Sequence, residues 1–511
     1  NDVFCWRGAW ILKPKGLLFF SLFLGIMILF QNCGNPFEAG QSQSSFSFCE
    51  PQQKQSSPFS QSKLQIPQAT IKASQKPGAP AVQAAIVLDM ACFKGQSEPL
   101  SLFSRPIEPA PNLLNLSKAV VNIEIPSELE TQEILDEINS KACLLGLAEN
   151  LELHKTQVAN PINAENLEED TIPEHNDPFA SLQGHLDFLG YERSRFLQDQ
   201  INQKVVVAII DTGVDYQHLE LNTRMWQDGS GNVGANFAYS FSDDPLDDDG
   251  HGTHVAGIIA ASQDNNFGVI GLTSDYVEIM AIKALDQDGN GSSAAVANGI
   301  QYAIANGADV INLSIEGLGR NTVLEAAIAD AVNAGVFVTA AAGNQGQEIT
   351  NQNLYSPAYI GPSVGGMMSV SSIDTNTLQL SYFSNYSTTF SEIAAPGAEN
   401  ARNNGGGILS TLPNDRFDRI FGTSQATPMI SSAGAMIIGY LKTRNVAYTA
   451  GAIESFIKSD GAMNHHLLQP YVVDSRVLQL GFLAENLSQY FDSAGNTTFE
   501  ENATTGNTCQ N

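Results

Sequence analysis

The chain has 511 residues, of which 43% are hydrophobic and 15% are charged, and its formal net charge is −29. That length is sufficient for one large core and accessory segments. The acidic excess argues against proteins that bind nucleic acids or anionic membranes, because both use clustered lysines and arginines. We therefore expect no nucleic-acid partner.

Residues 1–33 have the pattern of an export signal. Three basic residues precede an uncharged run over residues 16–30. This run is shorter than the roughly 20 residues of a membrane-spanning helix. The pattern therefore favours a signal peptide and an exported protein that is extracellular, periplasmic or anchored at the cell envelope.

Cys33 follows this run and resembles the lipidation site of bacterial lipoproteins. The preceding Phe30, Gln31 and Asn32 depart from the usual small-residue pattern. Lipid attachment stays open, and a membrane contact is expected only through such an N-terminal lipid or signal anchor.

The chain contains six cysteines, and none of them lies between Cys143 and Cys509. If Cys5 is removed with the signal and a lipid occupies Cys33, the other four allow three pairings. The simplest interpretation of Cys92 and Cys143 is a pair of buried thiols.

The N-terminal third is expected to contain one small folded unit between two linkers. Residues 34–83 are rich in Gln, Ser and Pro and cannot bury enough apolar surface to fold. Residues 84–157 have the pattern of an α+β unit, and residues 158–176 form an acidic linker. The predicted elements of the unit are strands at 84–90 and 119–125, a helix at 128–145 and a short strand at 151–155.

Residues 177–486 alternate between strand and helix patterns. The strands are almost continuously hydrophobic, which indicates an α/β fold with a central parallel sheet and helices on both faces. Residues 487–511 are polar without an amphipathic period and are predicted to be a disordered tail. The predicted strands are 204–210, 277–284, 309–315 and 335–341, and the helices include 292–305 and 321–333.

Three motifs carry the chemistry: DTG at 211–213, HGTH at 251–254 and GTSQATP at 422–428. They supply Asp211, His251 and Ser424 in one of the chain orders known for serine triads. A serine hydroxyl needs a base to remove its proton during attack. His251 is the predicted base, with Asp211 orienting its imidazole.

Other interpretations of these motifs are weaker. Aspartic proteases need a second DTG, which the chain lacks, and Ser424 lacks the G-x-S-x-G setting of α/β-hydrolases. A metal pair of His251 with His254 lacks further ligands at zinc spacing, so His254 is interpreted as structural. An N-cap role for Ser424 does not account for the other two motifs.

Residues 177–483 resemble the subtilisin-like serine proteases, the subtilases. The resemblance rests on ordered blocks that include VVAIIDTGVD, DDDGHGTHVAG, VINLSI, VTAAAGNQG, LSYFSNYS and GTSQATP. It implies a subtilisin-like fold, serine endopeptidase activity on proteins or peptides, and Asn344 as an oxyanion-hole residue. An amide N–H there, with the backbone N–H of Ser424, would stabilise the tetrahedral intermediate by roughly 3–4 kcal/mol. A plain turn asparagine is the alternative.

The resemblance also implies where a peptide binds. Two segments are similar to the edges between which subtilases clamp an extended substrate as an added strand. Glu316 stands where glycine is common, and a carboxylate at the pocket rim would favour a basic or small residue before the scissile bond. The implied substrate-binding residues are Gly289, Asn290, Gly291, Ser314, Ile315, Glu316 and Gly343.

A structural calcium ion is a further implication, because residues 263–271 resemble the family's calcium loop. Glu220 falls where an aspartate is usual, and Gln183 is a further candidate. The aspartates within residues 243–249 are interpreted as a solvated acidic loop, with a second ion as the alternative. The implied ligands are Glu220, Gln263, Asn265, Phe267 and Val269.

The α+β unit at 84–157 resembles the inhibitory propeptide of subtilases in its pattern and placement. The implied protein is a secreted zymogen inhibited by its own propeptide, with maturation cleavage between residues 157 and 177. An N-terminal domain that stays attached is the alternative. The rival function is a catalytically silent binding protein that retains the fold.

Overall fold

The computed structural model describes residues 82–494, apart from 97–99, 104, 108, 126–136, 139, 142, 150–151, 157–174, 240–241 and 400–405. The predicted signal, the lipidation site and most of the first linker lie outside the described residues. So do the acidic linker up to residue 174 and the chain beyond residue 494.

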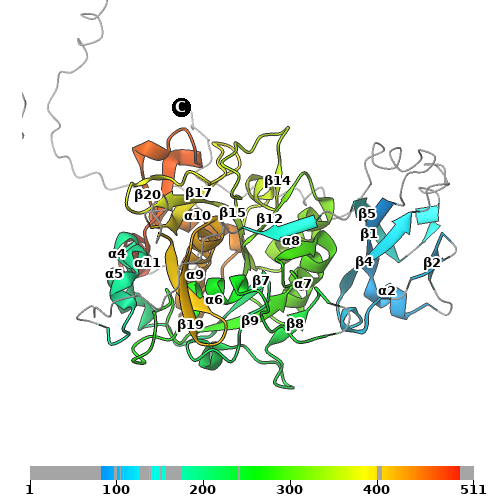
Figure 1. Ribbon diagram of the computed structural model, residues 1–511, viewed down its shortest axis with the longest axis horizontal. Coiled ribbons are helices and arrows are strands. Elements are labelled where there is room, and N and C mark those ends of the chain that lie inside the picture. The colour runs from blue at the N-terminus through cyan, green and yellow to red at the C-terminus, as the bar shows by residue number, and fades with distance from the viewer. Residues whose placement is uncertain are drawn as a thin grey trace, which may run out of the picture. The chain divides into compact units, whose positions relative to one another are not determined.

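A ten-stranded sheet forms the centre of the larger part, with the order β20-β21-β17-β15-β13-β11-β7-β9-β8 and β16 beside β15 (Figure 1). The strands from β8 to β21 pair in parallel. β20 pairs antiparallel with β21 at one edge of the sheet, and β16 pairs antiparallel with β15. The predicted α/β class is confirmed. The strands are β7 (Val205–Asp211), β8 (Gly234–Asn236), β9 (Val277–Lys283), β11 (Val310–Leu313), β13 (Phe337–Ala341), β15 (Met367–Asp374), β16 (Gln379–Leu380), β17 (Ile393–Ala398), β20 (Ala462–Asn464) and β21 (Arg476–Leu478).

Helices cover both faces of this sheet. Along β7, Val207 and Ile209 pack with α6 and α9, whereas Ala208 and Ile210 pack with α7 and α8. This alternation follows from the two-residue period of a strand, and it explains why a doubly covered strand is continuously hydrophobic. The helices are α4 (Gly184–Leu189), α5 (Tyr191–Gln198), α6 (His251–Ala260), α7 (Ser293–Ala305), α8 (Thr322–Asn333), α9 (Thr423–Thr443), α10 (Ala450–Asp460) and α11 (Leu480–Ala494), with short 3₁₀ turns η1 (Pro111–Leu113), η3 (Ala180–Leu182), η4 (Asn222–Arg224), η5 (Ala358–Ser363), η6 (His466–Leu468) and η7 (Val473–Ser475).

The strand predicted at 309–315 is divided in the structure. β11 ends at Leu313, and Ile315 begins β12 (Ile315–Leu318), which belongs to another sheet. That second sheet has the order β10-β6-β12-β14. It therefore places β6, from the N-terminal unit, between two strands of the larger part. The other three strands are β6 (Glu152–Lys155), β10 (Asn290–Ser292) and β14 (Tyr355–Ser356), and a separate hairpin joins β18 (Ile408–Leu412) to β19 (Arg416–Ile420).

The central helix α9 is buried along nearly its whole length and contains Pro428. A proline has no N–H, so the carbonyl of Ser424, four residues earlier, lacks its helical donor. The hydroxyl of Ser314 donates to that carbonyl at 3.0 Å instead. This contact joins the start of α9 to the residue that follows β11.

The N-terminal unit is a three-stranded antiparallel sheet of order β4-β1-β5 with its own apolar core. The helix predicted at 128–145 is wrong at its end, because Leu144 begins β5, while residues 126–136 lie outside the described chain. The elements are β1 (Val82–Asp89), α2 (Met90–Lys94), β2 (Ser101–Leu102), β3 (Arg105–Pro106), β4 (Lys118–Ile125) and β5 (Leu144–Glu149).

Cys92 and Cys143 form a disulfide in this unit. Interpreting them as buried thiols is wrong. Cys92 lies on α2, directly after β1, and Cys143 directly precedes β5. Because β1 and β5 are neighbours in the sheet, the pairing of the strands brings the two sulfurs together.

The tail predicted from residue 487 is also wrong over its first eight residues, because α11 continues to Ala494. Leu487 is fully buried in the core, and Tyr490 and Phe491 pack against it. Tyr490 faces the ring of Phe456, and Phe491 that of Tyr440. Three apolar side chains at helical spacing are sufficient to anchor an otherwise polar segment. Within the described part of the chain, no helix has the length and apolarity to cross a membrane.

We predict that Leu487→Ala lowers the free energy of unfolding by about 3 kcal/mol, because it leaves a cavity in a packed core. Leu467→Ala is the matched control: that side chain is 38% exposed, and its loss should cost less than about 1 kcal/mol. Thermal or denaturant unfolding of the two variants measures the difference. Equal, small effects would show that α11 does not belong to the core.

Candidate active site

Asp211 and His251 form a buried pair. Asp211 is the last residue of β7 and His251 the first of α6. The histidine Nδ1 lies 2.7 Å from Asp211 Oδ1, and both side chains are fully buried. Asp211 Oδ1 also accepts the backbone N–H of Thr212 at 2.7 Å. The carboxylate therefore fixes the imidazole through Nδ1 and leaves Nε2 on the other side of the ring.

Ser424 is the second residue of α9, and α9 packs against α6. Its Oγ contacts both the carbonyl oxygen and the hydroxyl of Thr156, from the N-terminal unit. It also lies 3.1 Å from the carbonyl oxygen of Ser314. The serine that the sequence singles out is thus covered by a segment of the same chain.

Three polar atoms of this site are buried without a hydrogen-bond partner among the described residues: Asp211 Oδ2, His251 Nε2 and Asn344 Nδ2. Buried polar atoms are nearly always paired, so unpaired ones need an explanation. Here they belong to three of the four residues predicted from the motifs. Because His251 Nε2 is one of them, His251 and Ser424 form no hydrogen bond here, and Ser424 Oγ is bonded to Thr156 and Ser314 instead.

The amide of Asn344 is oriented by the start of α9. Its Oδ1 accepts from the backbone N–H of Thr423 at 2.9 Å and from its hydroxyl at 3.0 Å, which leaves Nδ2 unpaired. A Cβ on Gly422 would come within 2.6 Å of the Thr156 carbonyl oxygen and 3.0 Å of Asn344 Nδ2. Gly422 thus leaves open the space in which that carbonyl and the amide lie close together.

The acidic loop before His251 is solvated at Asp243, Asp244 and Asp248, as predicted from the sequence, but not at Asp247. Asp247 is buried, and its carboxylate accepts from the hydroxyl of Thr212, from Gly250 N and from both N–H and hydroxyl of Thr253. Thr212 Oγ1 in turn accepts from Gly252 N at 2.9 Å. This network joins the DTG segment to the beginning of α6.

Lys283 reinforces the same junction. Its Nζ, almost fully buried, donates to Asp248 at 2.6 Å and to the carbonyl oxygens of Thr212 at 2.6 Å and Leu285 at 2.9 Å. Sequence reasoning missed Asp247, Thr212 and Lys283, because the contacts that join the DTG segment to the loop and to β9 span 35–71 residues of the chain. The signal that could have found them is their position within or directly beside the recognised blocks.

The two predicted peptide-binding edges enclose β6. His154 is opposite both Asn290 of β10 and Glu316 of β12, and the two pairings are antiparallel. At the end of β6, Lys155 N donates to Gly289 O at 3.0 Å. The next residue, Thr156, donates its N–H to Ser314 O at 3.2 Å. Gly291 and Ile315 face Leu153 and Lys155 in these pairings. Six of the seven predicted residues thus lie beside one extended segment, residues 153–156.

Glu316 is only 9% exposed while β6 lies on its strand, so its place at a pocket rim stays a prediction. Its carboxylate accepts from Gln345 Nε2 at 2.7 Å and from Asn344 N at 3.3 Å. Burial raises the pKa of Glu316. A Cβ on Gly343, the seventh predicted residue, would come within 2.3 Å of Glu316 Oε2. The side chain therefore crosses to the loop of Asn344 and occupies space beside it.

The predicted calcium residues lie together around Glu220. The buried carboxylate of Glu220 accepts from Val269 N at 3.1 Å and from Asn265 Nδ2 at 3.0 Å, and burial raises its pKa to about 8. Gln263 Nε2 donates to Gly271 O and Thr273 O.

The side chains of two neighbouring residues, Gln183 and Asn265, already form hydrogen bonds to the backbone of this loop. Gln183 is bonded through both amide ends to the backbone of Ile270, and Phe267 N donates to Asn265 Oδ1. Nearby, ligand atoms of His175, Asp177 and Asp264 lie within 4.8 Å of one another, a group that the sequence did not predict.

His254 is buried on α6, and its Nε2 lies 3.1 Å from the carbonyl oxygens of both Ile408 and Asp418. Burial lowers its pKa to about 3, so the ring is neutral. These contacts join α6 to the hairpin of β18 and β19, in agreement with a structural role.

A parallel sheet with helices on both faces, an Asp–His pair at a strand end and a serine at a helix start define the class of protein. The model of the subtilase family matches residues 202–467. The chain belongs to the subtilase family.

Two curated relatives and one solved structure illustrate the similarity. Subtilisin amylosacchariticus of Bacillus subtilis subsp. amylosacchariticus is 35% identical over 258 residues, which is 50% of this chain and 61% of that protein. Subtilisin of Bacillus pumilus is also 35% identical over 258 residues, with 50% and 85% covered. Proteases from Pseudoalteromonas arctica PAMC 21717 match in structure with a TM-score of 0.51 and 25% identity, over 61% of this chain and 99% of that one.

Proposed function

We propose that this protein is a serine endopeptidase of proteins or peptides, exported as a zymogen. Ser424 is the nucleophile, His251 its general base, Asp211 the residue that orients the base and Asn344 an oxyanion donor. The observation that carries the proposal is the fixed Asp211–His251 pair together with the unpaired His251 Nε2 and Asn344 Nδ2. Family membership supports it.

In this mechanism the Ser424 hydroxyl attacks a peptide carbonyl as His251 Nε2 takes its proton. Asp211 accepts from Nδ1 and stabilises the imidazolium that results. Asn344 Nδ2 and the backbone N–H of Ser424 bind the oxyanion of the tetrahedral intermediate. His251 then gives the proton to the leaving amine, and water hydrolyses the acyl-enzyme through the same steps.

Residues 84–157 are proposed to be the inhibitory propeptide. Residues 152–156 lie between the two peptide-binding edges as an added strand, and the Thr156 carbonyl lies against Ser424 Oγ. That is the position of the residue before a scissile bond. We therefore propose that maturation cuts the bond after Thr156, directly before the interval of residues 157–177 expected from the sequence. Residues 177–486, extended by α11, are proposed to form the catalytic domain.

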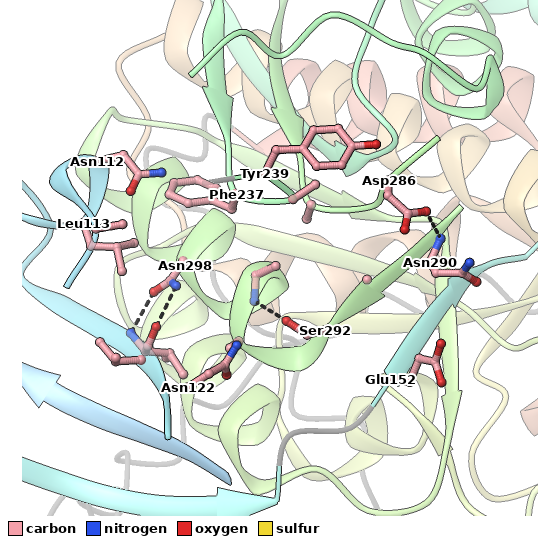
Figure 2. Close-up of a pocket in the computed structure, with 18 residues that line it drawn as sticks. Asn112, Leu113, Asn122, Glu152, Phe237, Tyr239, Asp286, Asn290, Ser292 and Asn298 are labelled. Atoms are coloured by element: carbon pink, nitrogen blue, oxygen red, sulfur yellow. Dashed lines mark hydrogen bonds between the residues drawn. The ribbon is translucent and has the colours of Figure 1, made fainter. Parts of the chain in front are cut away.

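The contacts of the N-terminal unit with α7 and α8 support this role. Asn298 on α7 accepts from Val120 N at 2.8 Å and donates to Val120 O at 2.9 Å, so it pairs with β4 as a neighbouring strand would (Figure 2). Lys118 binds Asp330 of α8 at 2.6 Å. A cavity of about 610 Å³ remains beside Asn298, lined from both units (Figure 2).

We predict that Ser424→Ala abolishes reaction with a serine-directed phosphonate, lowers kcat by about 10⁶-fold and leaves the chain uncut after Thr156. Mass spectrometry of the N-terminus and peptide hydrolysis measure both effects. Ser432→Ala, on the same helix, is the control and keeps both activities. Full hydrolysis by Ser424→Ala would overturn the mechanism, and an inert wild-type protein would favour the silent binding protein.

Glu316 is proposed to restrict the residue before the scissile bond to small side chains, such as Thr156. We predict that Glu316→Gly raises kcat/KM for phenylalanine relative to threonine at that position by about tenfold, because it opens apolar space. Glu316→Gln keeps the volume and is expected to keep the preference, which separates size from charge. Cleavage profiling of peptide libraries measures it; an unchanged profile for Glu316→Gly contradicts the proposal.

A structural calcium ion is proposed at the loop of residues 263–269. Glu220 is a buried carboxylate whose hydrogen-bond donors, Val269 N and Asn265 Nδ2, are neutral. Burial raises its pKa to about 8, and a bound cation would stabilise its ionised form at neutral pH. Glu220, the Asn265 side chain and the carbonyls of Gln263, Phe267 and Val269 would hold the ion. The side-chain oxygens of Asn265 and Gln183 already accept from Phe267 N and Ile270 N, so either one would bind the ion beside that hydrogen bond. The ion would fix this loop and take no part in hydrolysis.

We predict that removing calcium with a chelator lowers the free energy of unfolding by about 2–3 kcal/mol relative to calcium at about 100-fold its Kd. Glu220→Gln removes most of this response, because the site loses its charge. Asp243→Asn, in the acidic loop, is the control and keeps the response. A melting temperature of the wild-type protein that ignores both calcium and chelator would rule the site out.

A further inference from the structure

Lys155 occupies a defined position relative to Ser424. It directly precedes Thr156, and its backbone N–H is held by Gly289 O at 3.0 Å, while Thr156 N–H is held by Ser314 O at 3.2 Å. A peptide bound as proposed would therefore place its second residue before the scissile bond where Lys155 lies. The surroundings of the Lys155 side chain are those that a substrate side chain meets.

The Lys155 ammonium group forms an ion pair with the carboxylate of Asp249. The lysine side chain is 23% exposed and the aspartate 11%. The pair is thus partly withdrawn from water, where a charged hydrogen bond contributes more than at an open surface.

The aliphatic part of Lys155 lies against Gly289. A Cβ on Gly289 would come within 2.6–2.8 Å of Cγ, Cδ and Cε of the lysine, and Gly289 has a φ of +76°. Position 289 therefore has to be glycine both for its backbone and for the passage of the side chain. The space fits a long unbranched stem that ends in a positive charge.

Of the three consecutive aspartates directly before Gly250, Asp249 is the one whose carboxylate binds the covering segment. Asp247 is saturated by backbone and threonine donors, and Asp248 is paired with Lys283. One oxygen of Asp249 accepts from His251 N at 3.1 Å, which fixes the carboxylate relative to the catalytic histidine. The other oxygen binds Lys155. Once the segment leaves, the described residues supply no other basic partner for it.

Resting on the proposed function, we propose that Asp249 is a specificity-determining residue. It selects polypeptide substrates that carry lysine or arginine at the second position before the scissile bond. Gly289 contributes by accommodating the stem of that side chain. The protein's own Lys155 is the first side chain to occupy the site. The preferred substrate is then a basic residue followed by a small one.

The test compares two fluorogenic peptides that differ only at the second position, one with lysine and one with norleucine, each followed by threonine. Norleucine keeps the stem and removes the charge. With enzyme matured from the full chain, we expect kcat/KM to be about tenfold higher for the lysine peptide, from the charged hydrogen bond. In Asp249→Asn, whose amide oxygen can still accept from His251 N, the ratio falls towards one. In Asp288→Asn, an exposed aspartate of the same cleft, it is unchanged.

The outcomes separate the two levels of the proposal. Hydrolysis of both peptides by the wild-type enzyme with no preference for lysine overturns this inference and leaves the proposed function intact. A preference that persists in Asp249→Asn also overturns it. Failure of the wild-type enzyme to cleave either peptide or to react with a phosphonate overturns the proposed function, and this inference with it. A ratio lost in Asp249→Asn and kept in Asp288→Asn supports it.

Discussion

The hydrogen bond between Asp211 and His251 joins the end of a central strand to the start of a helix, and much of the surrounding structure serves to hold it. Asp247 and Lys283 tie the DTG segment to the loop that enters α6. Both are buried polar groups with several partners. Such networks are costly to bury unless they are fully satisfied, and when satisfied they specify one arrangement.

Ser424 is also held in place by a buried polar contact. Pro428 removes a helical donor from the serine carbonyl, and the hydroxyl of Ser314 replaces it. Ser314 also supplies, through its carbonyl, the acceptor for the backbone of Thr156. Ser314 thus links the helix of Ser424 to the edge on which residues 152–156 lie. The position of the serine and the register of the bound strand are coupled through it.

The parts of the fold that could be predicted from the sequence are those with strong local patterns. The continuous hydrophobic strands located β7, β9 and β13 within two residues, and the glycine-flanked motifs pointed to Asp211, His251 and Ser424. The end of β11 was missed because Ser314 and Ile315 continue the apolar pattern while the chain changes sheets.

Other features depend on contacts that local patterns do not contain. The polar sequence after residue 486 hid the helix that Tyr490 and Phe491 anchor. The Cys92–Cys143 pairing depends on which strands are neighbours. The contacts of the Glu316 carboxylate with Asn344 and Gln345 could not be predicted, because those residues lie on another segment. The sequence shows that a carboxylate is present at position 316, but only the folded chain determines which groups it contacts.

The strand that covers Ser424 belongs to the same polypeptide as Ser424. Its occupancy of the cleft is therefore an intramolecular equilibrium, governed by an effective concentration and independent of how dilute the protein is. A single cut after Thr156 would turn this intramolecular equilibrium into a bimolecular one between two separate chains. The two pieces would then separate more completely the more dilute the protein is, so dilution alone would uncover Ser424 in the cut protein.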